Sequence, residues 1–446
     1  MRGRYFAPAR RDLGPVTIVG LVAAWTILWW VERPVGDASS YWGQWFGSLS
    51  VLLLSIGLVL ASTFPGVESW FDGIDLAAVW HRRVAITALI VLVPHFALAS
   101  NPDSSALANA LAVIGAVGLL LMALWAILPR LGSLAPASLR DLAFRIHDAS
   151  WTRGIRGALG GYTHWRAWHR ATGLFVMAGF VHGVLDETAF AGAPLLRWTY
   201  LTIGGIGIAC YAYRELLARY TGTHLHYEVD SVRTIDDGLV EIALRPLGTG
   251  IAFVPGQFAM VYLEAKDGWH RHPFTIASAP SERVVRFTVK ALGDYTSELH
   301  ELVEPGMPAV LGAPHGRFDH RHGRYRQVWI AGGVGVTPFL SWLRALDGHL
   351  DQRVDFFYST DGEAPYTDEI RDIASRHGTL TVHVIDSTVT GFLTTKTVLA
   401  TVGDTASAAL TVFMCGPEQM LRAFQAGFHT AGVPRSQVHR EHFDWR

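Results

Sequence analysis

The sequence predicts a multi-domain protein, in which an all-α bundle of six transmembrane helices precedes an antiparallel β-barrel and an α/β domain built on a parallel sheet. Three observations predict this architecture. The 446-residue chain is 50% hydrophobic and only 17% charged, whereas soluble proteins carry about 25% charged residues. Long uncharged runs fill the first half and end near Arg214. After Thr221 charges return, with strand-like alternation first and a strand–helix rhythm later.

The overall composition excludes several classes of protein. The formal net charge is −1, so no global positive field indicates a nucleic-acid partner. Cys210 and Cys415 are the two cysteines of the chain. Two cysteines cannot build a disulfide scaffold, a Cys-rich zinc site or a four-Cys iron–sulfur cluster.

Six uncharged runs are candidates for membrane-spanning helices. They are Gly14–Val31, Ala38–Val67, Val84–Pro102, Ser104–Pro129, Ala171–Leu185 and Trp198–Tyr213. A span needs about 20 apolar residues, with a lower limit near 17. The first four runs meet that length, and the last two meet it only with their flanks. Because lipid cannot satisfy a bare backbone, each span is expected to be a helix.

The placement of arginine predicts the orientation in the membrane. Fifteen arginines lie in the N-terminal segment, in the loops after the second and fourth runs, and in the segment after the last run. The loops on the opposite side hold two, Arg33 and Arg197. Positive charge concentrates on the cytoplasmic side. We therefore expect a multi-pass protein of the cell membrane, with the N-terminus and everything after Arg219 in the cytoplasm.

The second half of the chain is expected to hold two domains. Period-two alternation over 227–244 and 284–290 predicts strands of a small barrel. Short apolar runs over 328–331, 354–358, 380–385 and 409–414 alternate with helix-like segments and predict a parallel sheet. The predicted domains are therefore residues 1–220 (transmembrane), 221–322 (barrel) and 323–446 (α/β).

Four histidines lie at bilayer depth. The third run and its flank contain His81 and His95, and the fifth run and its flank contain His169 and His182. An ionisable side chain inside a membrane is costly and is a functional candidate by default. Two helices that each offer an inner and an outer histidine suggest two stacked metal sites, as bis-histidine haem ligation requires. The alternative is that these side chains hydrogen-bond across the bundle without a metal.

Helical phase supports that hypothesis for one helix only. A step of 14 residues, from His81 to His95, returns to within about 40° of the same helix face. A step of 13, from His169 to His182, does not, so this pair requires a bend or rotated haems. Pro94 offers a kink in the third run, and we expect Gly173, Gly179 and Gly183 to leave room for a flat ligand. His147 and His164, outside the spans, are expected to be solvated.

Two segments of the barrel region suit a flavin. Val254–Phe258 (Val-Pro-Gly-Gln-Phe) precedes a strand, and His272–Ser278 follows as His-Pro-Phe-Thr-Ile-Ala-Ser. An aromatic ring can flank a flavin, and the Thr275 hydroxyl can bond the ring edge or a phosphate. Gly293–Ser297 then leads into a helical stretch, whose free N–H groups suit a pyrophosphate. Each segment alone is also an ordinary turn or cap.

The α/β region contains a glycine-rich turn and a cysteine turn. Ile330–Pro338 runs from a strand through Gly332, Gly333 and Gly335 into a helix that opens with Thr337-Pro338. Such a turn lets the backbone approach a dinucleotide, although glycines alone are a weak signal. A later strand runs into Cys415-Gly416-Pro417. A cysteine at the carboxyl end of a parallel strand lies where open α/β sheets bind ligands.

With these motifs the chain resembles the NADPH oxidase and ferric reductase membrane family, and its second half is similar to the ferredoxin–NADP reductase fold. The resemblance covers roughly Gly14 to the end. It implies that His81 and His169 ligate an inner b-type haem and that His95 and His182 ligate an outer one. It implies FAD binding by His272, Pro273, Phe274, Thr275, Gly293, Asp294 and Thr296. It implies NAD(P)H binding by Gly332, Gly333, Gly335, Thr337, Cys415, Gly416 and Pro417, with Cys415 close to the nicotinamide.

The resemblance further implies an activity. A C-terminal aromatic covers the flavin in this family, and the tail offers Phe443 or Trp445. Electrons from cytoplasmic NAD(P)H would pass through FAD and two haems to an acceptor on the far side. We expect a small-molecule acceptor, in the first place ferric iron or another metal chelate. An oxygen-reducing, superoxide-producing oxidase and an electron-supply module for a periplasmic protein partner are the alternatives.

Two departures from the family pattern bear on donor and acceptor. The segment Ser359–Glu363 contains Asp361 and Glu363 where NADPH-preferring relatives often carry an arginine, so NADH is credible as the donor. The oxidases carry a histidine one helical turn beyond the outer ligand of the third span, and this chain has Ala99 there. The second feature argues against superoxide production and leaves ferric reduction at least as likely.

Overall fold

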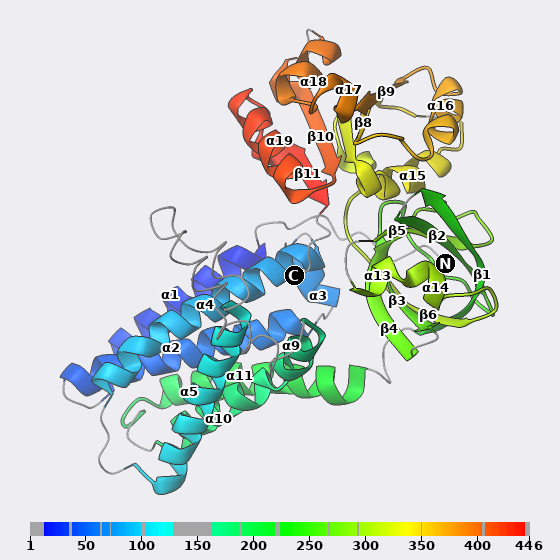
Figure 1. Cartoon of the computed structure of the whole chain (residues 1–446). Helices are drawn as coiled ribbons and strands as arrows, with labels where there is room; N and C mark the ends of the chain where they lie inside the picture. Colours follow the sequence, from blue (N-terminus) through cyan, green and yellow to red (C-terminus); the bar gives the residue numbers. More distant parts are fainter. Residues whose placement is uncertain are drawn as a thin grey trace, which may run out of the picture. The chain divides into compact units, whose positions relative to one another are not determined.

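The computed structural model describes residues 13–34, 38–62, 65–71, 73–99, 104–127, 162–186, 190–218, 224–236, 238–265, 268–291, 294–348, 350–403 and 406–441. The chain forms two compact units, Met1–Tyr220 and Thr221–Arg446. The first unit is helical and the second contains two β-sheets with helices around them (Figure 1).

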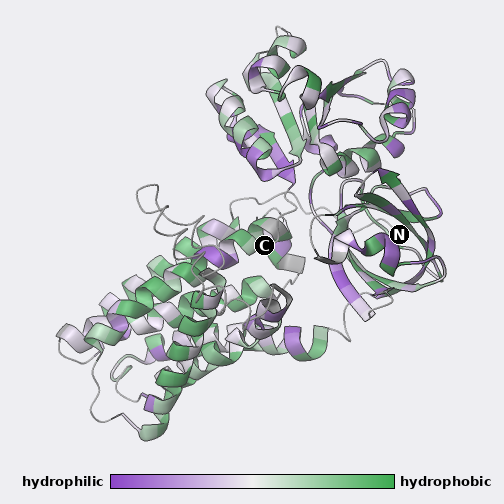
Figure 2. Ribbon diagram, viewed as in Figure 1, coloured by the Kyte–Doolittle hydropathy of each residue, from purple (hydrophilic) through white to green (hydrophobic). Residues whose placement is uncertain are grey.

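The helical unit is built from long apolar helices. Its elements are α1 (Leu13–Glu32), α2 (Ala38–Ala61), α3 (Pro65–Phe71), α4 (Ile74–Leu98), α5 (Ala106–Ile127), α9 (Tyr162–His169), α10 (Thr172–Leu185) and α11 (Pro194–Ala212), followed by a π-helical turn, Tyr213–Leu217. Helix α2 packs along α4 and α11, and α10 packs along α5. Hydrophobic residues predominate along the helices of this unit (Figure 2).

Four helices are long and apolar enough to cross a membrane, namely those over Leu13–Glu32, Ser39–Ala61, Leu76–Leu98 and Ala106–Ala126. Helix α10 has 14 residues, fewer than the roughly 17 that a span needs. Helix α11 has 19 residues but includes Arg197 in its first turn. The fifth and sixth spans therefore remain predictions.

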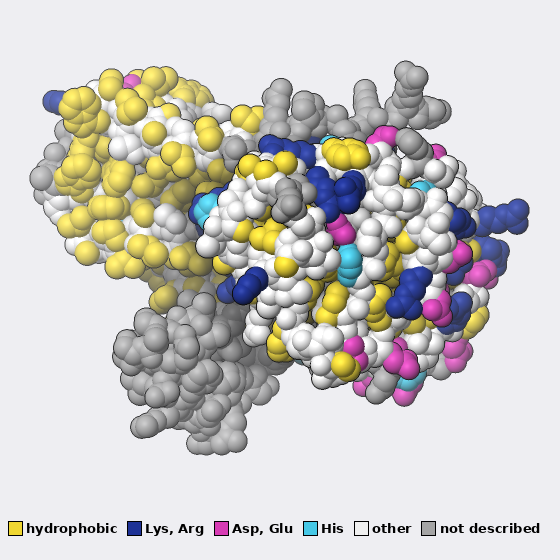
Figure 3. All heavy atoms as spheres, turned by 90° about the horizontal axis from the view of Figure 1, so that it is seen from above, with side chains coloured by type: hydrophobic (Ala, Val, Ile, Leu, Met, Phe, Trp, Pro, Cys, Tyr) yellow, Lys and Arg dark blue, Asp and Glu magenta, His cyan; other side chains and the backbone are white. Residues whose placement is uncertain are grey.

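The exposed surface of this unit is apolar. Val19 of α1, Val93 of α4 and Val113 of α5 are 64%, 67% and 61% exposed. In contrast, 61% of the apolar window of α2 is buried. On the face that Figure 3 shows, hydrophobic side chains cover most of the described part of this unit. Soluble proteins rarely expose apolar patches of this extent, and lipid is the environment that suits them.

The first sheet of the second unit is an antiparallel barrel. Its strands are β1 (Leu225–Asp236), β2 (Leu239–Pro246), β3 (Phe258–Ala265), β4 (Gly268–Thr275), β5 (Val285–Lys290) and β6 (Pro308–His315), in the order β4-β3-β6-β1-β2-β5. The predicted alternation over 227–244 forms the β1–β2 hairpin, whose turn holds Gly238 at φ +71°. Two short helices, α13 (Asp294–Ser297) and α14 (Leu299–Leu302), follow β5.

The second sheet is parallel, as the sequence predicts. It contains β7 (Arg326–Gly332), β8 (Arg353–Thr360), β9 (Leu380–Asp386), β10 (Leu410–Cys415) and β11 (Val438–Glu441), in the order β11-β10-β7-β8-β9. Helices α15 (Thr337–Arg344) and α16 (Thr367–Ser375) cover one face. Helices α18 (Thr395–Val402) and α19 (Glu418–Thr430) cover the other, and the short α17 (Ser387–Thr390) follows β9.

The strand order places a ligand crevice between β7 and β10. The chain leaves β7 toward β8 and β9, and then crosses to β10 on the opposite side of β7. Strands β7 and β10 are direct neighbours, with Ala331 paired to Cys415. Open parallel sheets bind ligands at the carboxyl ends of the strands, where the order reverses in this way. Both predicted nucleotide turns therefore lie at this crevice.

Candidate functional site

The four membrane histidines form two pairs. The rings of His81 and His169 have centroids 6.2 Å apart, and those of His95 and His182 have centroids 6.4 Å apart. Helix α4 supplies one member of each pair, and the end of α9 and the last turn of α10 supply the others. When two imidazole nitrogens bind one metal ion from opposite sides, at about 2 Å each, the ring centroids lie about 6.2 Å apart. The spacing of each pair is compatible with that arrangement.

The Nδ1 atoms of three of these rings are engaged by main-chain carbonyls. Nδ1 of His81 lies 2.8 Å from the Gly57 oxygen, Nδ1 of His95 lies 2.8 Å from the Gly43 oxygen, and Nδ1 of His182 lies 3.0 Å from the Ala108 oxygen. A carbonyl only accepts, so Nδ1 donates, and in the neutral ring Nε2 is left with a free lone pair. This second interaction is the usual way in which a protein orients a metal-binding histidine.

His169 is held by a side chain instead. Its Nδ1 lies 3.3 Å from Oγ1 of Thr172, and its ring stacks on Trp165 with centroids 4.7 Å apart. His164, on the same short helix, is exposed, as the sequence predicts. His147 lies outside the described residues.

A helix break resolves the phase problem of the 169/182 pair. Helix α9 ends at His169 and α10 begins at Thr172, so that only Arg170 and Ala171 separate the two helices. The bend that a step of 13 residues requires is therefore present. On α4, Pro94 lies within the helix beside His95, and both α4 histidines share one face without a break.

The glycines of α10 have different roles from one another. A Cβ at Gly173 would meet the ring of Tyr211, and a Cβ at Gly183 would meet the hydroxyl of Tyr200, so both serve helix packing. A Cβ at Gly179 would meet nothing within 4 Å. Gly179 lines a cavity together with His95 and His182. Of the three glycines that we expected to make room for a flat ligand, Gly179 and Gly183 line this cavity, and Gly179 alone would accept a Cβ without a close contact.

Two histidines without further protein ligands suit a metal ion whose other coordination positions are filled by a cofactor. Among the residues that the structure describes, no third His, Cys, Asp or Glu joins either pair in a group that could hold a metal ion. A bare cation is rarely held by two imidazoles alone, whereas haem iron needs only axial ligands from the protein. The donor set of each pair therefore suits the haem ligation that the sequence analysis expects.

The predicted flavin residues lie on β4 and at the start of α13. His272, Pro273, Phe274 and Thr275 end β4, with the rings of His272 and Phe274 stacked at 5.9 Å. Strand β4 ends the hydrogen-bonded order, which tolerates a proline. Thr296 lies on α13; Asp294 begins that helix, and its side chain and Gly293 lie outside the described part of the chain.

Within the described residues of the barrel, the Thr275 hydroxyl is a buried polar group that lacks a hydrogen-bond partner. The Thr275 side chain is 6% exposed. Leaving a buried hydroxyl unpaired costs about 1–3 kcal/mol. A bound group that accepts or donates at this position would remove that cost, which fits the role predicted for Thr275 toward FAD.

The two nucleotide turns pack against each other at the crevice. A Cβ at Gly335 would overlap the backbone of Cys415, and a Cβ at Gly416 would lie 3.1 Å from the Cα of Gly332. These glycines are therefore required for contact between the turns. Gly333, at φ +51° with nothing within 4 Å, is the position where the backbone is open to a ligand.

The helix after the glycine turn begins as the sequence predicts. Thr337 is the first residue of α15, its hydroxyl donates to the Val334 carbonyl at 3.0 Å, and Pro338 follows in the first turn. The N–H groups of such a start suit the charge of a pyrophosphate. Pro417 is the N-cap residue of α19.

Cys415 is a buried, neutral thiol. It is 0% exposed, and burial, with a smaller contribution from Glu441, raises the pKa of the thiol well above its usual value. Glu441 is its register partner on β11 and is itself buried. The sequence analysis assigned no role to Glu441, because the four-residue β11 is too short to show a pattern. Phe443 and Trp445 lie outside the described residues.

Family comparisons agree with this geometry. Residues 224–336 match the FAD-binding domain family, and residues 329–426 match the oxidoreductase NAD-binding domain family. The second unit is a ferredoxin reductase-type FAD/NAD module. Its antiparallel and parallel sheets are the barrel and nucleotide domains that the sequence predicts.

Similar proteins include reductases, flavohemoproteins and NADPH oxidases. The chain is 28% identical over 246 residues to the propane 2-monooxygenase reductase component of Mycolicibacterium smegmatis, which covers 51% of this chain and 70% of that protein. It is 26% identical over 239 residues to a Burkholderia flavohemoprotein, covering 50% and 60% of the two chains. It is 27% identical over 181 residues to NADPH oxidase 1 of Mus musculus, covering 38% and 30%.

Solved structures include the FAD/NAD-binding domain of nitric oxide dioxygenase from Vibrio cholerae. It aligns with a TM-score of 0.43 at 20% identity, over 49% of this chain and 97% of that domain.

Proposed function

We propose that this protein is a transmembrane oxidoreductase that uses cytoplasmic NAD(P)H, FAD and two b-type haems to reduce an acceptor on the extracytoplasmic side of the cell membrane. The observation that carries the proposal is the pair of histidine sites, each with ring centroids 6.2–6.4 Å apart. The FAD/NAD module and the NADPH oxidase relatives support an electron supply of this kind. When bound, FAD turns the two-electron hydride into single electrons, which the haem irons carry one at a time.

The protein's own residues supply order and position. Gly333 and the start of α15 would receive the pyrophosphate, and Cys415 would line the nicotinamide side of the crevice as a neutral thiol. Thr275 would hold the flavin through its buried hydroxyl. His81 and His169 would hold the inner haem, and His95 and His182 the outer one, with Nδ1 of each ring fixed as described.

The proposed orientation places the N-terminus and the FAD/NAD module in the cytoplasm, with six spans in total. The excess of 15 arginines over two supports this orientation. Ferric iron or another metal chelate is the preferred acceptor, because the methyl group of Ala99 offers no hydrogen bond to oxygen beyond His95. The NADPH oxidase relatives favour the oxidase as the second candidate. An electron supply to a periplasmic protein is the third.

An acceptor panel separates these functions. The purified full chain, in lipid nanodiscs with NADH or NADPH, is offered Fe(III) chelates without oxygen, and then oxygen with a superoxide-specific dye. Reduction of the chelate without superoxide supports the reductase, and dye reduction that superoxide dismutase abolishes supports the oxidase. Inertness toward both, with FAD and haems bound, favours a protein acceptor. Absence of a bis-histidine b-type haem spectrum would overturn the proposal.

NADH is expected to be the better donor. Asp361 and Glu363 are exposed just after β8, and Asp386 ends β9 as the cap of α17. Carboxylates here repel the 2′-phosphate of NADPH and can accept hydrogen bonds from the ribose hydroxyls of NADH. We expect kcat/KM to be roughly tenfold higher for NADH, about 1.4 kcal/mol. Replacing Asp361 and Glu363 with Asn and Gln should narrow that ratio, whereas a wild-type preference for NADPH would contradict the assignment.

Changing Thr275 to valine is expected to weaken FAD binding by about tenfold or more, because the hydroxyl that meets the flavin is lost while the side-chain shape is kept. Thr275→Ser keeps the hydroxyl and should stay within about threefold of wild type. FAD retained per protein after gel filtration, and the FAD concentration that restores NADH oxidation, measure the effect. Equal retention by both variants would remove Thr275 from the flavin site.

A further inference from the structure

Helix α15 joins the nucleotide crevice to the barrel. Its first residue, Thr337, follows the glycine turn, and its last residue, Arg344, lies at the opposite end of a helix of eight residues, about 12 Å long. All of its residues from Thr337 to Leu343 are buried. Because a short helix in a close-packed interior is rigid, a shift at one of its ends also moves the other end.

The second half of α15 donates three hydrogen bonds to carbonyl groups of the barrel. They run from Ser341 Oγ to Ser278 at 2.8 Å, from Arg344 Nη1 to Ala277 at 2.9 Å, and from Trp342 Nε1 to Pro255 at 3.1 Å. Ala277 and Ser278 directly follow the His-Pro-Phe-Thr-Ile motif, and Pro255 belongs to the Val254–Phe258 segment. The helix that begins at the nucleotide turn is therefore bonded to both segments that suit the flavin.

Gly256 makes one of these contacts possible. Its φ is +91°, and a Cβ there would meet the indole nitrogen of Trp342. Only glycine combines that backbone conformation with so close an approach.

Arg344 is the most heavily bonded residue of the helix. Its guanidinium binds Glu369 of α16 through Nε and Nη2, at 2.7 and 2.8 Å, and Nη2 lies 3.9 Å from Glu241 of β2. The same group lies over the ring of Tyr366, 5.5 Å from its centroid. The side chain is only 11% exposed. The Glu369 side chain is 37% exposed, and the bidentate geometry of the pair fixes orientation as well as distance.

Glu241 and Tyr366 continue the contact between sheet and barrel. The Tyr366 hydroxyl donates to Glu241 at 3.1 Å and lies 2.9 Å from the Thr288 hydroxyl of β5. Glu241 is 3% exposed and also meets Arg286 at 3.4 Å. Tyr366 has φ +65°, a conformation that costs a bulky residue about 1–2 kcal/mol. The contacts of its ring and hydroxyl hold it there.

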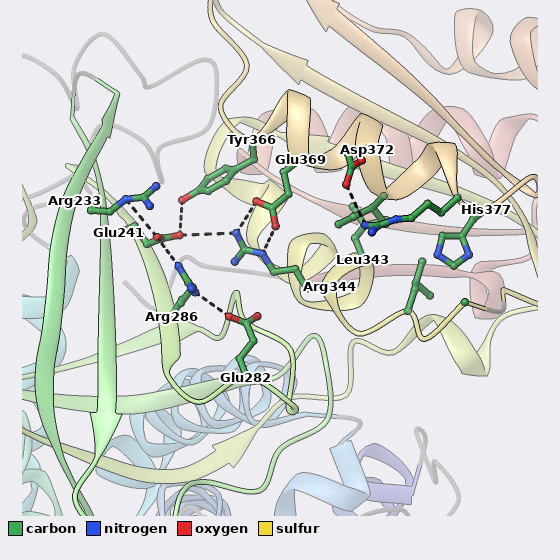
Figure 4. A pocket seen from close by; sticks show the side chains of 14 residues that line it. Arg233, Glu241, Glu282, Arg286, Leu343, Arg344, Tyr366, Glu369, Asp372 and His377 are labelled. Atoms are coloured by element: carbon green, nitrogen blue, oxygen red, sulfur yellow. Dashed lines mark hydrogen bonds and ion pairs between the residues drawn. The ribbon is translucent and has the colours of Figure 1, made fainter.

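The space behind this cluster is a polar hollow of about 650 Å³. Figure 4 shows Arg344 between Glu369 and Glu241, with the Tyr366 hydroxyl directed at Glu241 and with Arg286 reaching both Glu241 and Glu282. Four polar contacts join the nucleotide domain to the barrel here. Arg344 binds the Ala277 carbonyl and lies near Glu241, and Tyr366 binds Glu241 and Thr288. Arg344 is the residue among them that belongs to the helix beginning at the glycine turn.

We propose that Arg344 is a positioning residue for hydride transfer, which sets the approach of the nicotinamide to the flavin through the rigid helix α15. This inference rests on the proposed function, in which NAD(P)H loses two electrons as a hydride and FAD gains that hydride and one proton from solvent. Arg344 touches neither group. It fixes the carbonyl of Ala277, two residues after Thr275, relative to the helix whose first turn receives the dinucleotide.

The test measures hydride transfer in the purified full chain. Arg344→Gln, Arg344→Lys and Ser341→Ala are compared with Arg376→Gln, a matched control in the same hollow. Arg376 pairs with Asp372 at 3.2 Å, is 62% exposed and makes no hydrogen bond or ion pair to the described residues of the barrel. Stopped-flow absorbance gives the rate of flavin reduction at saturating NADH, its KM and its isotope effect with 4-deuterated NADH. FAD content and reduction by dithionite serve as checks that do not involve the nucleotide.

We expect Arg344→Gln to slow flavin reduction by roughly 10- to 100-fold, since a misplacement near 1 Å has that cost. KM should stay within about threefold, the isotope effect should rise, and dithionite reduction should not change. Arg344→Lys should recover part of the rate, Ser341→Ala should lose about threefold, and Arg376→Gln should match wild type.

Other results would overturn the inference. They are an unchanged hydride rate in Arg344→Gln, or a loss confined to KM. If Arg344→Gln fails to bind FAD, the milder variants decide, and wild-type rates in both Arg344→Lys and Ser341→Ala would equally overturn it. A wild-type chain that binds FAD but is not reduced by either nucleotide would instead refute the proposed function.

Discussion

Changing His95 to alanine is expected to remove one of two haems from the purified protein and to lower reduction of an external acceptor by at least 100-fold. His95 and His182 face each other with ring centroids 6.4 Å apart, so the loss of one imidazole leaves the outer haem with one axial ligand. The hydrogen bond from Nδ1 to the Gly43 carbonyl is lost with the ring. A metal site without a ligand and its orienting partner loses most of its affinity.

The same variant should leave the cytoplasmic chemistry intact. Reduction of FAD by NADH should keep its rate, because no residue of the module is changed. A pyridine haemochrome assay gives the haem content, and low-temperature difference spectra show which component is lost. His164→Ala is the matched control, since His164 is an exposed histidine of α9; it should retain both haems. Two haems in His95→Ala would refute the pairing.

The second large effect is expected for Gly335→Ala. A Cβ at Gly335 would overlap the backbone of Cys415, where the two nucleotide turns meet. Backbone cannot give way as a flexible side chain can, so the glycine turn must shift relative to β10. A displacement near 1 Å is enough to lower the rate of hydride transfer by about 100-fold.

This defect should be confined to the nucleotide. Gly335→Ala should keep its FAD and both haems and should be reduced normally by dithionite, while NADH reduces the flavin slowly. Gly378→Ala is the matched control, because a Cβ there meets nothing within 4 Å. Normal reduction of Gly335→Ala by NADH would contradict the prediction that the close contact of this turn with Cys415 controls hydride transfer.

The sequence predicts the sheets well because each has a local signature. Three apolar runs of the α/β domain lie in the buried strands β7, β8 and β10, and the fourth lies in β9, an edge strand that is mostly part-exposed. The alternating runs form β1, β2 and β5. A bend between His169 and His182 was one of the two alternatives that the step of 13 residues left open, and the structure has a helix break after His169.

What the sequence did not reveal depends on contacts between distant segments. The sequence does not show that the carbonyls of Gly43 and Gly57 orient histidine rings. Every residue carries a carbonyl, and only packing decides which one a ring meets. Gly173 was expected to admit a ligand, but the ring of Tyr211 takes that space. Arg344 was overlooked because its partners lie on another helix and on the barrel.

Helix α2 has a property that links the two histidine sites. Its acceptor carbonyls, at Gly43 and Gly57, are separated by 14 positions, as are the histidines that they meet on the antiparallel α4. The equal spacing on the two helices therefore lets both histidines meet their carbonyl partners at the same time. One residue inserted into α2 between the two glycines would turn one carbonyl by about 100° relative to the other. Only one imidazole could then keep its carbonyl partner. An insertion or deletion in this stretch of α2 is therefore expected to disturb one histidine site, even where no side chain touches a cofactor.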